Sequence, residues 1–285
     1  MKILVTGING FVGQHLLREL ESRGFDVYGL DIESFSQKTI AASILDSSSI
    51  SRALNELNPQ YIIHLAAIAS VNQENSRIIY NVNFYGTLNL LAAAVVLQPM
   101  PKFIYVSSSQ VYGAVNNNNT PFNEFCEIKP VNQYGASKAA AEMIVRAHGY
   151  EYGMEYVIAR PFNHTGPGQT NKFVVPKMVN EFRKKSVSIE LGSIDTIRDY
   201  TDVRDVVKAY CDIINSFRNG EIYNISSGKG ISIQEIFDKL VTISGHDMKI
   251  VKKNFLVRNN EIKSNIGSSD KIKKDIGWEK RIALH

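Results

Sequence analysis

The chain has little cysteine and tryptophan, and it lacks long apolar runs. Only Cys126 and Cys211 occur among its 285 residues, and they lie far apart without the spacing of metal ligands. A disulfide scaffold and a zinc site are therefore not expected, and we predict a reduced, cytoplasmic protein that binds no metal. No apolar stretch is long enough to span a membrane, and the chain opens directly into a strand-like "MKILVTG" rather than a signal peptide. We therefore expect no membrane partner.

The charge balance is mild, with a formal net charge of +4. The basic stretches "EFRKKS" and "KIKKDIGWEKR" are short and interrupted, which favours solvated helix faces over a nucleic-acid-binding surface. We therefore expect no nucleic-acid partner. A modest positive excess would suit a small anionic substrate.

Short apolar runs alternate with amphipathic segments through the first half of the chain, which is typical of a parallel sheet covered on both faces. The predicted helices cover residues 11–22, 48–57, 80–97 and 135–149. Right-handed crossovers between the runs would give an α/β fold with a Rossmann-type, doubly wound parallel sheet.

The alternation weakens after Pro161, where "NHTGPGQTNKF" is predicted to be a loop. Further on, "IRDYTDVRDVVKAYCDII" is predicted to be a turn followed by a helix. We assign residues 1–160 to a dinucleotide-binding domain, with residues 195–228 returning to it. A smaller C-terminal α/β lobe, residues 161–194 and 229–285, is expected to bind the substrate.

The stretch "VTGINGFVG" places Gly7, Gly10 and Gly13 between the first strand and the first helix. Glycines there permit a tight turn, let backbone N–H groups approach a pyrophosphate, and let the helix pack close to the strand. The phosphates would lie at a helix N-terminus, which favours negative charge. The pattern predicts a dinucleotide site, although its spacing is G-x-x-G-x-x-G rather than G-x-G-x-x-G.

The second strand ends in Asp31, whose carboxylate can accept both ribose hydroxyls of an adenosine and would repel a 2′-phosphate. This position favours NAD(H), unless Asp31 merely starts a turn. Lys38 follows seven residues later, which leaves NADP(H) open. Asp46, after the apolar "ASIL", is expected to meet the adenine edge.

Tyr134 and Lys138 are an i,i+4 pair on one face of a predicted helix. Moving a hydride to or from a carbinol carbon requires a proton to move at the oxygen. A lysine ammonium one turn away is expected to stabilise the phenolate and to hold the nicotinamide ribose. A hydroxyl from the serines that end "KFIYVSSS" would hydrogen-bond the substrate oxygen at the carboxyl edge of the sheet.

These features together resemble the extended short-chain dehydrogenases/reductases of the nucleotide-sugar epimerase, dehydratase and reductase group. The motifs that carry the resemblance are "TGINGFVG", "HLAA", "NVNFYGTLNLL", "SSSQVYG", "YGASK" and "RPFNHTGPGQ". The resemblance implies that Ser108 is the catalytic hydroxyl, Tyr134 the general acid/base, and Lys138 the residue that orients the cofactor. It also implies that Asn83 helps to hold the serine loop. The implied cofactor-binding residues are Gly7, Asn9, Gly10, Phe11, Val12, Gly13, Asp31, Asp46, Leu65, Ala66, Ala67, Asn83, Val106, Tyr134, Lys138 and Pro161.

The residues after Ser108 bear on the reaction. Related 4,6-dehydratases carry a glutamate as the second residue after the catalytic hydroxyl, where this chain has Gln110. An amide cannot serve as that base. "ARPFNHTGPGQ" and "KFVVP" resemble reductases that act on GDP-4-keto-6-deoxy-D-mannose and related sugars, which implies NAD(P)H-dependent reduction of a C4 keto group. The implied substrate-binding residues are Ser109, Gln110, Asn163, Val174, Lys177, Arg198, Arg258 and Glu261.

Several alternatives stay open at this point. Arg198 could instead form a salt bridge with Asp199, Asp202 or Asp205, and a structural role is favoured for His64 and His164. The closest functional rival is a 4-epimerase that keeps its NAD tightly bound, and a non-catalytic, cofactor-sensing protein is the rival from another class. The resemblance further implies a homodimer formed through the helices at residues 80–97 and 135–149.

Overall fold

The computed structural model describes residues 1–69, 75–114, 121–257 and 262–283. These residues include a seven-stranded sheet of order β10-β6-β5-β4-β1-β2-β3, in which neighbouring strands are all parallel. The strands are β1 (Lys2–Thr6), β2 (Asp26–Asp31), β3 (Thr39–Ala41), β4 (Tyr61–His64), β5 (Lys102–Val106), β6 (Tyr156–Pro161) and β10 (Ile222–Ile225). The predicted Rossmann-type, doubly wound sheet is confirmed.

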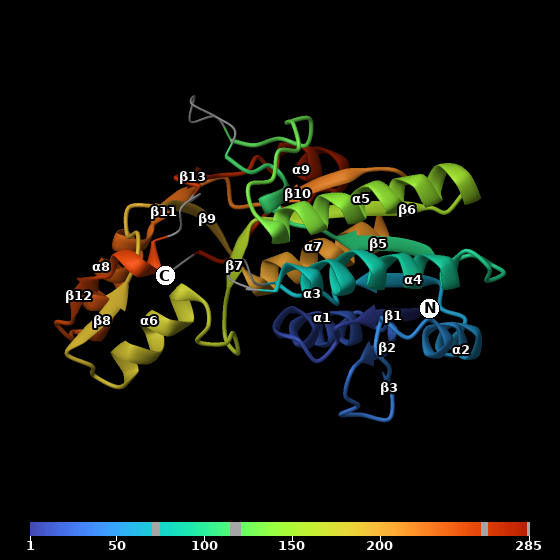
Figure 1. Cartoon of the computed structure of the whole chain (residues 1–285), viewed down its shortest axis with the longest axis horizontal. Helices are drawn as coiled ribbons and strands as arrows, with labels where there is room; N and C mark the ends of the chain where they lie inside the picture. The colour runs from blue at the N-terminus through green and yellow to red at the C-terminus, as the bar shows by residue number, and fades with distance from the viewer. Residues whose placement is uncertain (70–74, 115–120, 258–261, 284–285) are drawn as a thin grey trace.

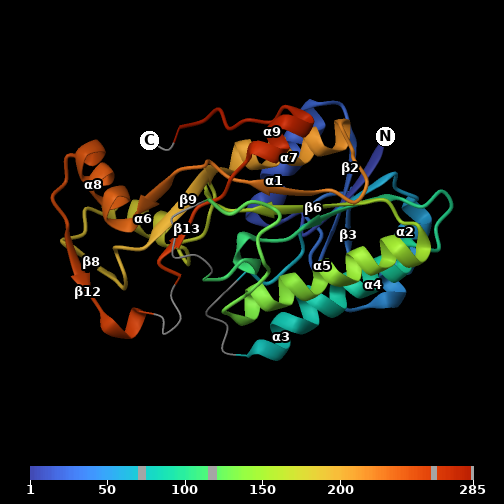
Figure 2. The ribbon, with the colours of Figure 1, turned by 90° about the horizontal axis from the view of Figure 1, so that it is seen from above.

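Helices cover both faces of this sheet (Figure 2). One face carries α1 (Phe11–Ser22), α7 (Val203–Asn215) and α9 (Asp270–Ile276), and the other α2 (Ser47–Leu57), α4 (Gly86–Ala94) and α5 (Gln133–Tyr152). Successive residues of β1 alternate between the two cores, since Ile3 packs into the first and Leu4 into the second. A strand that is buried on both faces reads as one continuous apolar run, which explains the sequence pattern.

The helix predicted at residues 80–97 forms in several parts. It begins as α3 (Ser76–Tyr80), continues as a π-helical turn (Asn81–Tyr85), and ends as α4. The helix predicted at 135–149 is the middle of α5, which begins at its N-cap Asn132 and ends at Gly153 in the left-handed conformation. The helix predicted at 11–22 has the bounds of α1.

A smaller lobe lies beyond the carboxyl end of the sheet (Figure 1). Its central strand is β9 (Ile197–Asp202), which pairs with β7 (Asn163–Thr165), β11 (Gly230–Ser232) and β13 (Ser264–Asn265). A second pair, β8 (Ser188–Leu191) with β12 (Lys249–Lys252), shares a core with α6 (Val174–Arg183) and α8 (Ile233–Ser244). The confirmed fold class includes this α/β lobe.

The prediction of a turn at the start of "IRDYT" was wrong, because these residues form β9. The strand is stable there because its backbone is paired on both sides and the buried Asp199 carboxylate accepts hydrogen bonds from neighbouring backbone amides. Within residues 195–228, α7 and β10 belong to the main sheet and its cover, whereas β9 belongs to the smaller sheet. The proposed assignment of residues 1–160 and 195–228 to one domain stays a prediction.

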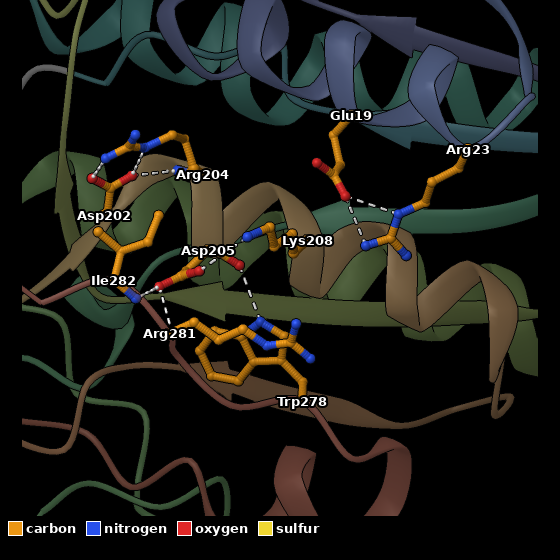
Figure 3. Close-up of polar contacts among 9 residues, drawn as sticks. All are labelled: Glu19, Arg23, Asp202, Arg204, Asp205, Lys208, Trp278, Arg281 and Ile282. Carbon is orange, nitrogen blue, oxygen red and sulfur yellow. Dashed lines mark hydrogen bonds and ion pairs between the residues drawn. The ribbon is translucent and has the colours of Figure 1, made fainter.

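Asp205, in the first turn of α7, binds the C-terminal segment through hydrogen bonds (Figure 3). One carboxylate oxygen of this buried residue accepts from the backbone amides of Arg281 and Ile282, at 2.8 and 2.7 Å. The indole of Trp278 donates to the Asp205 carbonyl at 3.0 Å, and the Lys208 ammonium lies 3.6 Å from the other carboxylate oxygen. These contacts hold the segment after α9 against the helix that covers the sheet.

Within the described ranges, no helix combines the length and the apolar character needed to cross a membrane.

Candidate active site

The predicted glycine turn forms between β1 and α1. Gly7 has a φ of +71°, and a Cβ atom built on it would lie 2.9 Å from the backbone of Ala66. A Cβ on Gly13 would lie 2.4 Å from the Gly7 carbonyl oxygen, because α1 packs closely on the turn. Gly10 is the N-cap of α1 and offers no side chain to its first amides. The turn therefore leaves a helix N-terminus available to a phosphate.

Asp31 lies beside this turn. Its carboxylate accepts from the backbone amides of Asn9 at 2.9 Å and Ile32 at 2.8 Å, which places it at the carboxyl end of β2 next to the glycines. Lys38 takes another direction, because its ammonium lies 2.8 Å from a carboxylate oxygen of Asp26. Lys38 was the reason for keeping NADP(H) as an alternative cofactor, and its ammonium is paired with Asp26.

Asp46 is the N-cap of α2. Its carboxylate accepts from the hydroxyls and the backbone amides of Ser49 and Ser48, and these hydrogen bonds lower its pKa to about 2. Its contact with adenine stays a prediction.

The loop after β4 approaches the glycine turn, as the resemblance implies. The amide of Ala66 donates to the Thr6 hydroxyl at 3.2 Å. Asn83 is buried, and its side chain exchanges hydrogen bonds with the backbone of Ile68 and donates to the Ser137 hydroxyl at 3.0 Å. Asn83 therefore holds the loop after β4 against α5, and its predicted part in holding the serine loop stays a prediction.

The remaining predicted cofactor residues lie near the same edge of the sheet. Five of them are partly buried and pack against the two cores that flank the sheet: Phe11, Val12, Leu65, Ala66 and Val106. Ala67 follows Ala66 and is partly buried, and Pro161 is buried at the end of β6.

His64 is enclosed between two threonine hydroxyls. Its ring nitrogens lie 2.6 Å from the Thr6 hydroxyl and 2.9 Å from that of Thr87. Burial, and then the nearby charge of Lys138, lowers its pKa to about 3, so the ring is neutral. This environment agrees with the structural role favoured from the sequence.

Ser108, Tyr134 and Lys138 come from the end of β5 and the first turns of α5. Ser108 caps a short 3₁₀ helix, Ser109–Val111, by accepting from the Gln110 amide at 3.2 Å. Burial raises the pKa of Tyr134, and a hydrogen bond with the Ser108 hydroxyl opposes this rise. The fold therefore brings the predicted hydroxyl and the predicted phenol into contact. Lys138 lies one turn further along α5 and is 2% exposed.

The expected lowering of the Tyr134 pKa is not found. The reason is that burial has the largest effect on the phenol, and the Lys138 ammonium lies over the ring of Tyr105 instead, 4.5 Å from its centre. Burial also lowers the pKa of Lys138 to about 7, against the opposing effect of Glu142. A phenol with a raised pKa stays protonated near neutral pH, so it has a proton to give to a strongly basic alkoxide.

The turn that follows Ser108 is held from two sides by amides that the sequence analysis missed. The Gln110 side-chain oxygen accepts from Asn132 at 3.0 Å, and Asn132 in turn caps α5 by accepting from the Gly135 amide. From the smaller lobe, Asn265 donates to the Ser109 hydroxyl at 3.1 Å. Asn132 has a local signal, since asparagine before a helix is a common N-cap. Asn265 has none, because its partner lies 156 positions away.

A buried ion pair supports the same region. Arg160 of β6 makes two hydrogen bonds to Glu142 of α5, at 2.9 and 2.6 Å, and Ser107 also donates to Glu142. Arg160 further donates to the Tyr112 hydroxyl at 3.0 Å, and Tyr112 donates to Asn224 of β10 at 2.7 Å. Glu142 is one turn beyond Lys138, so its i,i+4 spacing was a signal that could have been found.

The predicted substrate residues of the smaller lobe are more dispersed. Asn163 is partly buried on β7, and Val174 begins α6 after its N-cap Phe173. The Lys177 ammonium donates to the backbone carbonyl of Glu190 at 2.7 Å. Beside Asn163, the His164 ring donates from Nδ1 to the Phe162 backbone carbonyl at 3.0 Å, and burial lowers the pKa of the ring.

Arg198 lies on β9 in register with Asn265 and donates to the Ile197 carbonyl at 2.8 Å. The three carboxylates considered as its partners have other contacts. Asp199 accepts from backbone amides, Asp202 pairs with Arg204, and Asp205 holds the C-terminal segment. The predicted residues Arg258 and Glu261 lie outside the described residues.

In the described part of the chain, His, Cys, Asp and Glu side chains form no group of three or more that could hold a metal ion.

Comparisons with known proteins agree with this geometry. A family profile described as "NAD dependent epimerase/dehydratase family" matches residues 3–226. GDP-6-deoxy-D-talose 4-dehydrogenase of Aggregatibacter actinomycetemcomitans is 36% identical, and the match covers 99% of this chain and 93% of that protein. GDP-6-deoxy-D-mannose reductase of Pseudomonas aeruginosa is 31% identical with the same coverage of both chains. The structure of RMD from Pseudomonas aeruginosa complexed with NADPH has a TM-score of 0.87 at 32% identity, over 99% of this chain and 94% of that one.

Proposed function

Because the chain belongs to the NAD dependent epimerase/dehydratase family, we propose that this nucleotide-sugar oxidoreductase is a 4-ketoreductase. Its substrate would be a nucleotide-diphosphate 4-keto-6-deoxyhexose, with GDP as the nucleotide, and its product the corresponding 6-deoxy sugar. The observation that carries this proposal is the proximity of the Ser108 hydroxyl to the Tyr134 phenol, with Lys138 one turn along the same helix. Two relatives are named for a GDP-6-deoxy sugar, and one of these names refers to position 4, which supports the choice of substrate.

Ser108, Tyr134 and Lys138 each have a separate role in the reduction at C4. The reduced nicotinamide, when bound, supplies the hydride. Tyr134 is a protonated phenol near neutral pH, and burial, which raises its pKa, keeps it so; it donates its proton to the oxygen as the alcohol forms. The Ser108 hydroxyl donates a hydrogen bond to the same oxygen and stabilises the developing negative charge. Lys138 holds the ribose hydroxyls of the cofactor and thereby aligns it with the sugar.

Gln110 favours reduction over dehydration. Its side-chain oxygen accepts a hydrogen bond from Asn132, and its carboxamide has no basic group. A proton at C5 of the sugar would therefore find no base at this position.

We further propose that NADH is preferred. The Asp31 carboxylate lies beside the Asn9 amide, where it would repel a 2′-phosphate, and Lys38 is paired with Asp26. One relative was studied with NADPH, so both cofactors belong in the test.

Two further expectations complete the proposal. The smaller lobe, residues 161–194 and 229–285, binds the nucleotide sugar. The chain forms a homodimer through the helices at residues 80–97 and 135–149, where Tyr85 is 54% exposed and Met143 46%. Large apolar side chains left exposed on neighbouring helices are typical of an interface.

The decisive experiment offers GDP-4-keto-6-deoxy-D-mannose, and matched UDP- and dTDP-4-keto-6-deoxy sugars, with NADH and NADPH. We expect stoichiometric oxidation of the nicotinamide and a 6-deoxyhexose product, whose C4 configuration NMR identifies. Turnover of a 4-hydroxy sugar without added cofactor would favour the epimerase instead. Binding of cofactor without oxidation by any keto sugar would favour the non-catalytic protein.

A further inference from the structure

Tyr105 lies directly beneath the lysine of the proposed active site. It belongs to β5, two residues before the serines, and its side chain is fully buried. The Lys138 ammonium lies 4.5 Å from the centre of its ring. A cation at this distance over the face of an aromatic ring is attracted by the negative charge of that face.

The ammonium has few other sources of stabilisation in this pocket. Lys138 is 2% exposed, so water solvates it poorly, and burial lowers its pKa to about 7. The carboxylate of Glu142 favours the charged form, but two hydrogen bonds from Arg160 already balance that carboxylate. Among the described contacts, Lys138 is the one cation that lies over the Tyr105 ring.

Among the residues that the structure describes, the remaining titratable groups around Lys138 carry no compensating charge. Burial keeps the ring of His64, on the neighbouring strand β4, neutral by lowering its pKa to about 3. Burial likewise raises the pKa of Tyr134, on the preceding turn of α5, so that this phenol is neutral as well.

The position of the Tyr105 ring is set by the sheet. Tyr105 pairs with His64 on one side and with Ile158 on the other, so its backbone is held by two strands. The His64 ring packs against it at 5.9 Å between ring centres. A ring held in this way offers its face to Lys138 at no further cost in ordering.

We propose that Tyr105 is a positioning residue that acts through Lys138: its ring face keeps the buried ammonium charged and in place for the cofactor ribose. The value of this role for catalysis rests on the proposed function, because it assumes that Lys138 holds the nicotinamide ribose. The effect on the charge of Lys138 does not depend on any sugar substrate.

The proposal predicts a change in pH dependence. Removing the ring face favours the neutral amine, so the Lys138 pKa falls by about one unit. Cofactor binding that requires the charged lysine is then lost at a correspondingly lower pH. In wild-type protein, cofactor binding weakens with rising pH as Lys138 loses its proton. In Lys138→Met this pH dependence of cofactor binding is absent.

The test compares three side chains at position 105. Tyr105→Phe keeps the ring and its negative face, Tyr105→Leu removes the ring, and 3,4,5-trifluorophenylalanine keeps the shape of phenylalanine but weakens the charge of its face. The fluorinated variant keeps the core filled, so it provides the answer if Tyr105→Leu fails to fold. The Lys138 amine is titrated by NMR in ¹⁵N-lysine-labelled protein, assigned with Lys138→Met, and NADH and NADPH binding is measured across the same pH range.

We expect the Lys138 midpoint of Tyr105→Phe to match that of wild-type protein, and the midpoints of the other two variants to fall by about one unit. Equal midpoints in Tyr105→Phe and its fluorinated counterpart would overturn the proposal, even if activity fell. The NMR titration requires no keto sugar. If it behaves as expected and no sugar is reduced, the proposed function fails and the charge-holding role of Tyr105 stands.

Discussion

Asn265 of β13 donates a hydrogen bond to the hydroxyl of Ser109, and both side chains are buried. Ser109 follows the proposed catalytic residue Ser108 in the chain. The bond therefore joins the smaller lobe to the catalytic turn. We expect Asn265→Leu to lower kcat by about tenfold and to change the KM for the sugar less, because a small misplacement of a catalytic group is costly.

A double-mutant cycle tests whether Asn265 acts through Ser109. Because the effect of Asn265 passes through one bond, Asn265→Leu combined with Ser109→Ala should be no slower than Ser109→Ala alone. Asn224→Leu is the matched control, since Asn224 is equally buried and contacts Tyr112 instead. Strictly additive effects of the Asn265 and Ser109 substitutions would show that the bond has no part in positioning the turn.

Tyr134→Phe removes the hydroxyl that is proposed to donate the proton. We expect turnover to fall by about 10²- to 10⁴-fold, while NADH affinity stays near the wild-type value. Stopped-flow measurement of nicotinamide oxidation, together with cofactor binding by fluorescence, separates the two effects. Tyr152→Phe, at the exposed end of the same helix, is the control and should be as active as wild type. Near-normal turnover in Tyr134→Phe would rule out its role as the acid.

Asp31 is predicted to decide between the two cofactors. Asp31→Ser removes the negative charge beside the glycine turn but keeps an oxygen that can accept from the Asn9 amide. The ratio of kcat/KM for NADPH to that for NADH should rise by about tenfold or more, because a 2′-phosphate is no longer repelled. Lys38→Ala is the control, and it should leave the ratio unchanged because Lys38 pairs with Asp26. A wild-type enzyme that prefers NADPH would contradict the assignment.

The Arg160–Glu142 pair predicts an asymmetric effect on stability. Glu142→Gln leaves the buried guanidinium without its balancing charge, and we expect it to lower the free energy of unfolding by about 3 to 5 kcal/mol. The double substitution Glu142→Leu with Arg160→Met should cost less, since neither charge is then left unpaired. Urea unfolding of the three proteins measures the difference. Lys184→Ala breaks an exposed pair with Glu181 and is the control, with a much smaller effect expected.

Finding Glu142→Gln as stable as wild-type protein would mean that the carboxylate is not needed to balance Arg160. Such a result would also weaken the inference about Tyr105, because Glu142 would then be free to act on Lys138.

The sequence determined those features that depend on short-range geometry. The spacing of Gly7 and Gly13 predicted the turn because a tight strand-to-helix connection leaves no room for a Cβ atom there. The four-residue step from Tyr134 to Lys138 predicted a shared helix face because an α-helix turns once in 3.6 residues. The continuous apolar runs predicted a sheet covered on both faces, since neither side of such a strand can face water.

Only the tertiary structure decided which groups meet across the molecule. Tyr105 lies beneath Lys138, and Asn265 reaches Ser109, because separate segments pack together at the carboxyl end of the sheet. The predicted lowering of the Tyr134 pKa was wrong for the same reason. The i,i+4 spacing puts a cation near the phenol, but burial sets the direction of the shift, and burial depends on every segment that covers the site.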